Sequence, residues 1–238
     1  MRALNIIANL PQWRLPMKRF PSMAAWFIVA VAAVLASNAA SAAKLPETWD
    51  GLVQRKVKGI DAVYVRPDVD FSVYRNIVLD PVQVAFDRNW KPNRVGSASA
   101  RLSTSDIERI RGEMATAFRD IFAEELAAGG YDIVAKPLDD TLGVTAGLAD
   151  VYITAPDTTS GGRTKTYTQS AGRMTLAMEL RDGPTGQLLA RVVDRHVDDS
   201  AFAQWTTSVS NSAEFRRTIK DWARRLVQGL DKVTGKAP

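Results

Sequence analysis

The sequence contains no cysteine among its 238 residues and only one histidine, His196. The absence of cysteine excludes disulfides, thiolate metal sites, a cysteine nucleophile and an amino-terminal cysteine that could be lipidated. A serine–histidine–aspartate triad would have to use His196. The G-x-S-x-G, H-E-x-x-H and P-loop motifs are also missing. We therefore assign no catalytic, cofactor-binding or metal-ligating residue from motifs, and we expect no cofactor.

Acidic residues are absent from the first 43 positions, which contain four basic residues. An apolar run, Met23–Leu35, follows the basic part, and small residues fill positions 36–43. This order is typical of a secretory signal peptide. An uncleaved anchor is disfavoured because the run is shorter than the roughly 20 residues that a membrane-spanning helix needs. We predict a signal peptide over 1–43, although Met17 would give a better-proportioned start.

Removal of this segment would change the charge of the chain. The whole chain has 31 basic and 26 acidic residues, and loss of the four basic residues would leave 27 against 26, a net charge of +1. Such a balance argues against nucleic-acid binding, which usually requires a basic patch. We expect a soluble periplasmic protein without a stable membrane anchor, and not a lipoprotein because there is no cysteine.

The remaining chain suits one domain. We predict a polar lead-in segment over 44–59 and a single domain over 60–235. Within the domain, Ile60–Arg66 and Arg75–Phe86 favour extended structure because they are rich in β-branched and apolar residues. Pro81 removes one backbone donor, so the second strand is expected at an edge or at a bulge.

Two amphipathic helices are predicted. Apolar residues recur at helical spacing from Ile107 to Leu126, with Ser105 and Glu108 as a capping box at the start. The pair Gly129–Gly130 is expected to end this helix. A second helix with an apolar stripe begins at about Ser212, and its basic residues are interpreted as a solvated face.

The strongest strand signal is a hairpin over Met174–Val197, where apolar and polar residues alternate on both sides of a Gly-Pro-Thr-Gly turn. The run Thr141–Ala155 alternates as well, but its parity changes, which predicts a bulge near Gly147. Asp157–Ala171 is interpreted as a loop or a weak strand. Together these patterns predict an α+β two-layer sandwich: a mostly antiparallel sheet of about six strands with both helices on one face.

Two groups of polar residues could carry chemistry. Asp68, Asp70 and Asp80 are interpreted as scaffold, because the first two lie in a predicted turn and the third precedes a proline. The segment 87–104 mixes basic residues with Trp90, and we interpret it as a solvated connection with a docked tryptophan rather than an anion-binding loop.

The second group surrounds the histidine. On a strand, Asp194, His196 and Asp198 share one face because side chains repeat every two residues. Two carboxylates and an imidazole on one face could form a metal site. The competing interpretation, which we favour, is the polar face of a hairpin strand.

Several short blocks of the sequence resemble a known family. Val65-Arg66-Pro67, Asp70-Phe71, Tyr74 and Asp80-Pro81-Val82 stand in the order that is typical of the bacterial domain-of-unknown-function 3313 family. The segments "EELAAGGYDIV", "ELRDGPTGQLLARVVDR" and "DWARRL" are similar to later blocks of that family. The resemblance implies an envelope protein, and it brings no catalytic residues. Family members are often lipoproteins, whereas Ala42-Ala43 stand here in place of a lipobox cysteine.

These observations leave three functional hypotheses. The first is a non-enzymatic accessory or binding protein of the envelope, with an unknown envelope protein or component as partner. The second is a metal-dependent enzyme that uses Asp194, His196 and Asp198. The third is a periplasmic domain that binds a small ligand between the sheet and the loop Asp157–Ala171. A convergent polar cluster around His196 would favour the second, and a deep apolar cavity would favour the third.

Overall fold

The computed structural model describes residues 46–90, 103–153, 166–167, 172–197, 205–206 and 208–235. Nine strands form the main sheet: β1 (Thr48–Trp49), β2 (Leu52–Arg55), β3 (Ala62–Val65), β4 (Asn76–Leu79), β5 (Gln83–Phe86), β6 (Asp132–Ile133), β7 (Thr141–Ile153), β9 (Gly172–Asp182) and β10 (Leu188–Val197). Two short strands, β8 (Thr166–Tyr167) and β11 (Trp205–Thr206), pair with each other. The helices are η1 (Phe71–Val73), α2 (Thr104–Ala128) and α3 (Ser208–Thr234).

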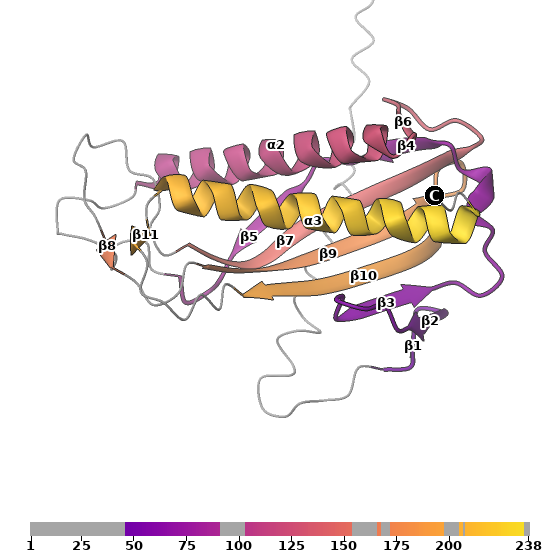
Figure 1. The fold of residues 1–238 in the computed structure, drawn as a ribbon, viewed down its shortest axis with the longest axis horizontal. Helices are drawn as coiled ribbons and strands as arrows, with labels where there is room; N and C mark the ends of the chain where they lie inside the picture. The colour runs from indigo at the N-terminus through magenta and orange to yellow at the C-terminus, as the bar shows by residue number, and fades with distance from the viewer. Residues whose placement is uncertain are drawn as a thin grey trace, which may run out of the picture.

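Helices α2 and α3 lie side by side on one face of the sheet, so the protein has two layers (Figure 1). The main core lies between these layers and joins apolar residues of both helices to those of the central strands. Its side chains with at most 1% exposure are Ile77, Phe118, Phe122, Leu126, Leu142, Val144, Leu148, Leu176, Ile219 and Ala223. The α+β class and the predicted two-layer arrangement are therefore confirmed.

The sheet has more strands than predicted, and they are not all antiparallel. The strand order is β1-β2-β3-β10-β9-β7-β4-β6, with β5 also paired to β7. Pairing is antiparallel from β1 to β7, but β4 and β5 run parallel to β7, and β6 runs parallel to β4. Helix α2 connects β5 to the following strands, and such a crossover is what allows parallel pairing. The sheet is therefore mixed and larger than six antiparallel strands.

The segment around Pro81 forms two strands instead of one. Strand β4 pairs with the start of β7, and β5 pairs with the later part of the same strand, from Gly147 onward. Pro81 stands in the gap between them, where its missing backbone N–H breaks no ladder bond. Ile77 is fully buried in the main core, and Leu79 packs against it, as the alternation predicted.

The segment predicted as a lead-in contains regular structure. Strands β1 and β2 form a hairpin that pairs with β3, so the sheet begins within 44–59. Asp50 and Gly51 occupy its turn with φ values of 52° and 77°. Positive φ at both turn residues is the geometry that Asp-Gly favours. This dipeptide is the local sequence signal of the hairpin.

The N-cap of helix α2 lies two residues before the predicted cap. Ser103 is the N-cap, with a capping box in which its side chain accepts from the Asp106 amide while Asp106 accepts from the Ser103 amide. Ser105 and Glu108, the predicted capping pair, therefore lie inside the helix. Gly129 ends the helix as predicted, and Gly130 follows with φ 79°.

The predicted hairpin is confirmed as β9 and β10, which are antiparallel across a turn that begins at Gly183. The predicted bulge exists, but it lies between Ala149 and Tyr152 instead of at Gly147. Asp150 takes the left-handed conformation there, with φ 51°, which accounts for the parity change. Apart from Thr166–Tyr167, the prediction for Asp157–Ala171 lies outside the described residues. Within the described part of the chain, no helix is long and apolar enough to cross a membrane.

Candidate functional site

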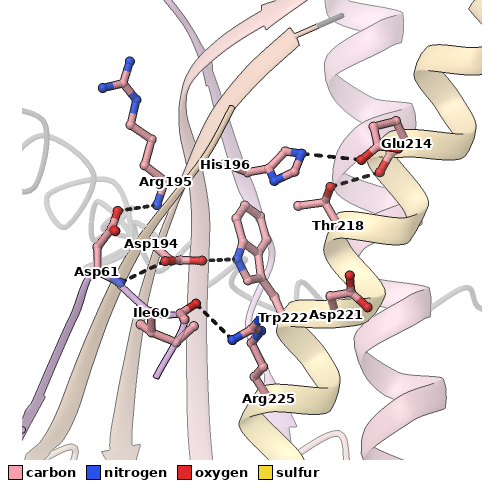
Figure 2. A pocket seen from close by; sticks show the side chains of 11 residues that line it. Ile60, Asp61, Asp194, Arg195, His196, Glu214, Thr218, Asp221, Trp222 and Arg225 are labelled. Atoms are coloured by element: carbon pink, nitrogen blue, oxygen red, sulfur yellow. Dashed lines mark hydrogen bonds and ion pairs between the residues drawn. The ribbon is translucent and has the colours of Figure 1, made fainter. Parts of the chain in front are cut away.

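A polar cleft lies where the end of β10 faces α3 (Figure 2). Its volume is about 430 Å³. The segment before β3 closes one side, so the cleft joins three parts of the chain that are distant in sequence. Its lining residues are Gly59, Ile60, Asp61, Asp194, Arg195, His196, Glu214, Thr218, Asp221, Trp222 and Arg225.

Periodicity explains why these side chains meet. On β10, Asp194 and His196 share the sheet face that α3 covers, because strand side chains alternate. On α3, Glu214, Thr218 and Trp222 recur every four residues and so lie along one stripe of the helix. The two sequence patterns therefore bring a strand stripe and a helix stripe together.

Asp194 connects the walls of the cleft through hydrogen bonds. One carboxylate oxygen accepts from the backbone N–H of Asp61 at 2.9 Å, and the other accepts from the indole Nε1 of Trp222 at 2.7 Å. The carboxylate of Asp61 in turn accepts from the backbone N–H of Arg195 at 2.9 Å. These bonds extend the β3–β10 pairing beyond its last ladder pair, Ala62 with Val193. Asp194 is 9% exposed, and both of its oxygens take part in structural hydrogen bonds.

His196 makes a looser contact with α3. Its Nε2 lies 3.5 Å from a carboxylate oxygen of Glu214, and this buried nitrogen makes no hydrogen bond within the described structure. The second oxygen of Glu214 accepts from Arg217 at 2.8 Å. The backbone carbonyl of Glu214 accepts from the hydroxyl of Thr218 at 3.0 Å. The imidazole therefore packs against the helix without a short polar bond to it.

The predicted metal group is brought together only in part. Asp194 and His196 line the same cleft, as their spacing predicted, while Asp198 lies outside the described residues. Among the residues that the structure describes, no group of three histidine, aspartate or glutamate side chains could hold a metal ion. Asp194 accepts one hydrogen bond on each of its oxygens, so its carboxylate already has structural partners.

Arg225 lines the cleft next to Gly59. Its guanidinium donates to the backbone carbonyls of Lys58 at 3.2 Å and Gly59 at 3.0 Å. Gly59 has φ +76°, and a Cβ there would lie 2.3 Å from Nη1 of Arg225. Glycine suits this backbone conformation, and a larger residue here would displace the guanidinium of Arg225. The sequence analysis did not predict this contact, for which the glycine at position 59 is a local signal.

The acids of the segment Tyr64–Phe86 lie outside the cleft, and each has a local environment of its own. Asp68 occupies a turn with φ 59°. Asp70 accepts from the backbone N–H of Ser72 at 2.8 Å, as its turn position predicted, and hydrogen bonds from Ser72 lower the pKa of its carboxyl. Asp80 accepts from the hydroxyl of Thr145. The bond of Asp70 lies within its turn, and the bond of Asp80 joins the end of β4 to β7; both agree with the scaffold interpretation.

Trp90 is docked as predicted. Its indole donates to the carbonyl of Ile153 at 2.9 Å, and its ring stacks on Phe86 with 4.3 Å between centroids. The basic residues that follow it in sequence lie outside the described residues.

The chain is similar to several solved bacterial proteins, at low identity and low TM-score. The PelC dodecamer from Paraburkholderia phytofirmans is 13% identical with a TM-score of 0.36, over 71% of this chain and 95% of that one. A minor lipoprotein from Acinetobacter baumannii is 13% identical with a TM-score of 0.31, over 70% and 98% of the two chains. A DUF4136 family protein from Bacteroides thetaiotaomicron is 12% identical with a TM-score of 0.31, over 78% and 98%. At such values these similarities carry no inference about function.

No curated protein sequence matches the chain significantly. Residues 41–226 match the family described as "Protein of unknown function (DUF3313)". This range spans the lead-in, the whole sheet and most of α3, so it covers far more than half of the chain. It also contains the short blocks that carried the resemblance in the sequence. The chain belongs to the DUF3313 family.

Proposed function

We propose that this protein is an exported, non-enzymatic accessory protein of the bacterial envelope, and that it binds a partner at the cleft between β10 and α3. The observation that carries the proposal is the bonding of Asp194, the buried carboxylate of the cleft. It accepts from Asp61 and Trp222 at the same time, so it serves to hold the cleft walls. These two bonds give the buried carboxylate a structural role that accounts for its place in the cleft.

Export is supported by the sequence of residues 1–43, which has the basic, apolar and small-residue regions of a signal peptide in the right order. We expect the mature protein to begin at Ala43 or Lys44. Amino-terminal sequencing of the protein from a periplasmic fraction tests this directly. An intact Met1 or Met17 on the fractionated protein would contradict cleavage.

Binding at the cleft can be tested by photo-crosslinking in intact cells. A photoreactive phenylalanine analogue would replace Asp221, an exposed α3 residue on the cleft wall. The matched control would replace Glu124, an exposed residue of α2, which lies on the other side of α3 from β10 (Figure 1). We expect a discrete crosslinked species from position 221 that position 124 does not give. Identical products from the two positions would contradict a specific site at the cleft.

A metal-dependent enzyme remains the second candidate, because Asp194 and His196 do line one cleft. It makes a different prediction. Purified protein would then contain stoichiometric zinc or another divalent metal, and His196→Ala would remove it. On our proposal, His196→Ala changes neither the metal content nor the amount of folded protein.

A further inference from the structure

The connection from β2 to β3 carries a concentration of positive charge. Arg55, Lys56 and Lys58 stand within four consecutive residues, and all three side chains are exposed. Exposed arginines of α3, such as Arg217 and Arg224, lie beside carboxylates. The three basic side chains of residues 55–58 form no ion pair with any described residue. This segment, the basic loop, therefore presents positive charge that its neighbours do not neutralise.

An apolar side chain lies at the centre of the basic loop. Val57 stands between the two lysines and is 46% exposed. A soluble polyanion offers little to such a side chain. The boundary between lipid headgroups and acyl chains, in contrast, accepts apolar groups next to basic ones. The combination of an exposed valine with lysines on both sides thus fits a membrane surface better than a soluble polyanion.

The basic loop is attached firmly to the rest of the fold. The guanidinium of Arg225 donates to the backbone carbonyls of Lys58 and Gly59 at 3.2 and 3.0 Å. Asp61, at the other end of the connection, is bonded to β10 through both its backbone N–H and its carboxylate. A segment that is already held in place loses little conformational entropy when it binds a surface.

The end of β10 adds charge of the same sign beside the basic loop. Arg195 is exposed, and its backbone N–H donates to Asp61 at 2.9 Å. Asp194 and His196 face α3, so the side chain of Arg195 between them points the other way, out of the cleft (Figure 2). Residues 55–61 have three basic side chains and one acidic one, a net charge of +2, and Arg195 increases it. Anionic phospholipid surfaces attract basic segments of this kind.

We infer that the basic loop, with Arg195 beside it, docks on a membrane surface that contains anionic phospholipids. The basic side chains meet the lipid phosphates, and Val57 enters the boundary between headgroups and acyl chains. Such binding is peripheral and reversible, so it requires neither a lipidated cysteine nor a membrane-spanning helix. The inference goes beyond the proposed function and does not depend on which partner the cleft binds.

The test uses a fluorescent label at the centre of the basic loop. Since the chain has no cysteine, Val57→Cys in the purified exported protein can be labelled at that position alone with a dye that brightens in apolar surroundings. Leu138→Cys is the matched control, because Leu138 is an apolar residue that is 54% exposed in the loop before β7. We expect saturable brightening at position 57 with vesicles of three parts phosphatidylcholine to one part phosphatidylglycerol. Pure phosphatidylcholine vesicles should give none, and position 138 should not respond to either.

Charge variants, made in the protein labelled at position 57, show which residues bind the lipid. Each basic residue at an anionic membrane changes partitioning about fivefold, so Lys56→Gln with Lys58→Gln should weaken binding roughly 30-fold. Lys136→Gln with Lys232→Gln removes the same charge from two exposed lysines elsewhere and should leave binding nearly unchanged. A tenfold rise in salt should weaken binding by the unmodified loop, because salt screens exposed charges.

Several results would overturn the inference. They are brightening that is equal with both kinds of vesicle, an equal response at positions 57 and 138, no response at all, or equal weakening by the two lysine pairs. A protein crosslinked at position 57 in intact cells, without any response to vesicles, would assign the basic loop to an acidic protein partner instead. The crosslink at position 221 tests the cleft separately, so either proposal can fail while the other stands.

Discussion

Glu179 is a buried charge whose removal should destabilise the fold strongly. It lies on the sheet face away from the helices, because its neighbours Met178 and Leu180 point into the main core. The side chain is 2% exposed and accepts from Arg191 at 2.7 Å and from Arg181 at 2.6 Å. Both carboxylate oxygens are thus used by guanidinium groups. Arg191 is nearly as buried, with 7% of its side chain exposed.

Glu179→Gln keeps the shape of the side chain and removes the charge. It leaves the guanidinium of Arg191 buried, and the new amide NH₂ faces arginine donors where an acceptor stood. Breaking a buried ion pair from one side costs about 3–5 kcal/mol. A typical domain is stable by about 5–15 kcal/mol, so this variant should lose a large part of its stability. The comparison variant is Asp50→Asn, which removes the other carboxylate on Arg191 but is 57% exposed, and should cost at most about 1 kcal/mol.

A double variant separates the cost of an unpaired charge from the worth of the pair. Replacing both Glu179 and Arg191 by methionine removes both buried charges and keeps apolar volume. Such replacements are often neutral or stabilising, so the double variant should be more stable than either single methionine variant. Arg181 also loses its partner Glu179 in the double variant, but its side chain is 31% exposed and can turn toward water.

The assay is urea denaturation followed by circular dichroism and by tryptophan fluorescence. Fluorescence is informative because the guanidinium of Arg191 lies 4.0 Å from the ring centre of Trp49. The reasoning is refuted if Glu179→Gln unfolds at the wild-type urea concentration. It is also refuted if the two methionine substitutions add their separate costs.

Five further variants test other parts of the structure by the same denaturation assay. Ile77→Ala should cost about 2–5 kcal/mol because its side chain is fully buried, and a larger loss from Asp70→Asn would contradict the scaffold interpretation. Hydrogen bonds from two basic residues of α3, Lys220 foremost, lower the pKa of the Glu125 carboxyl, so Glu125→Gln should destabilise above pH 4.5, and the penalty should vanish as the pH falls through the lowered pKa. Asp194→Asn should cost roughly 1–3 kcal/mol, whereas His196→Gln should shift stability by less than ~0.5 kcal/mol, and the reverse order would contradict their assigned roles.

The sequence predicted the elements whose signals are local. The β9–β10 hairpin and both helices followed from periodicity, and Gly129 marked the end of α2. The number and direction of the strands did not follow, because pairing depends on contacts between distant segments. The residues around Pro81 looked like one strand, but β4 and β5 pair separately with β7, and only the crossover through α2 makes that pairing parallel. The alternation on β7 also could not locate its bulge, since Asp150 takes a left-handed conformation that is uncommon for residues other than glycine.

In the cleft, too, the local spacing of residues predicted which side chains meet but not what each of them does. Alternation on a strand was sufficient to predict that Asp194 and His196 share a face, and the structure places both in one cleft. What Asp194 does there depends on Trp222, 28 residues later, and on the backbone of Asp61, 133 residues earlier. No local pattern predicts contacts between residues so far apart in the sequence. From the sequence alone, a strand face with a histidine between two aspartates could be a metal site or a structural contact. The hydrogen bond from the indole of Trp222 favours the structural contact, since it gives the buried carboxylate of Asp194 a partner within the protein.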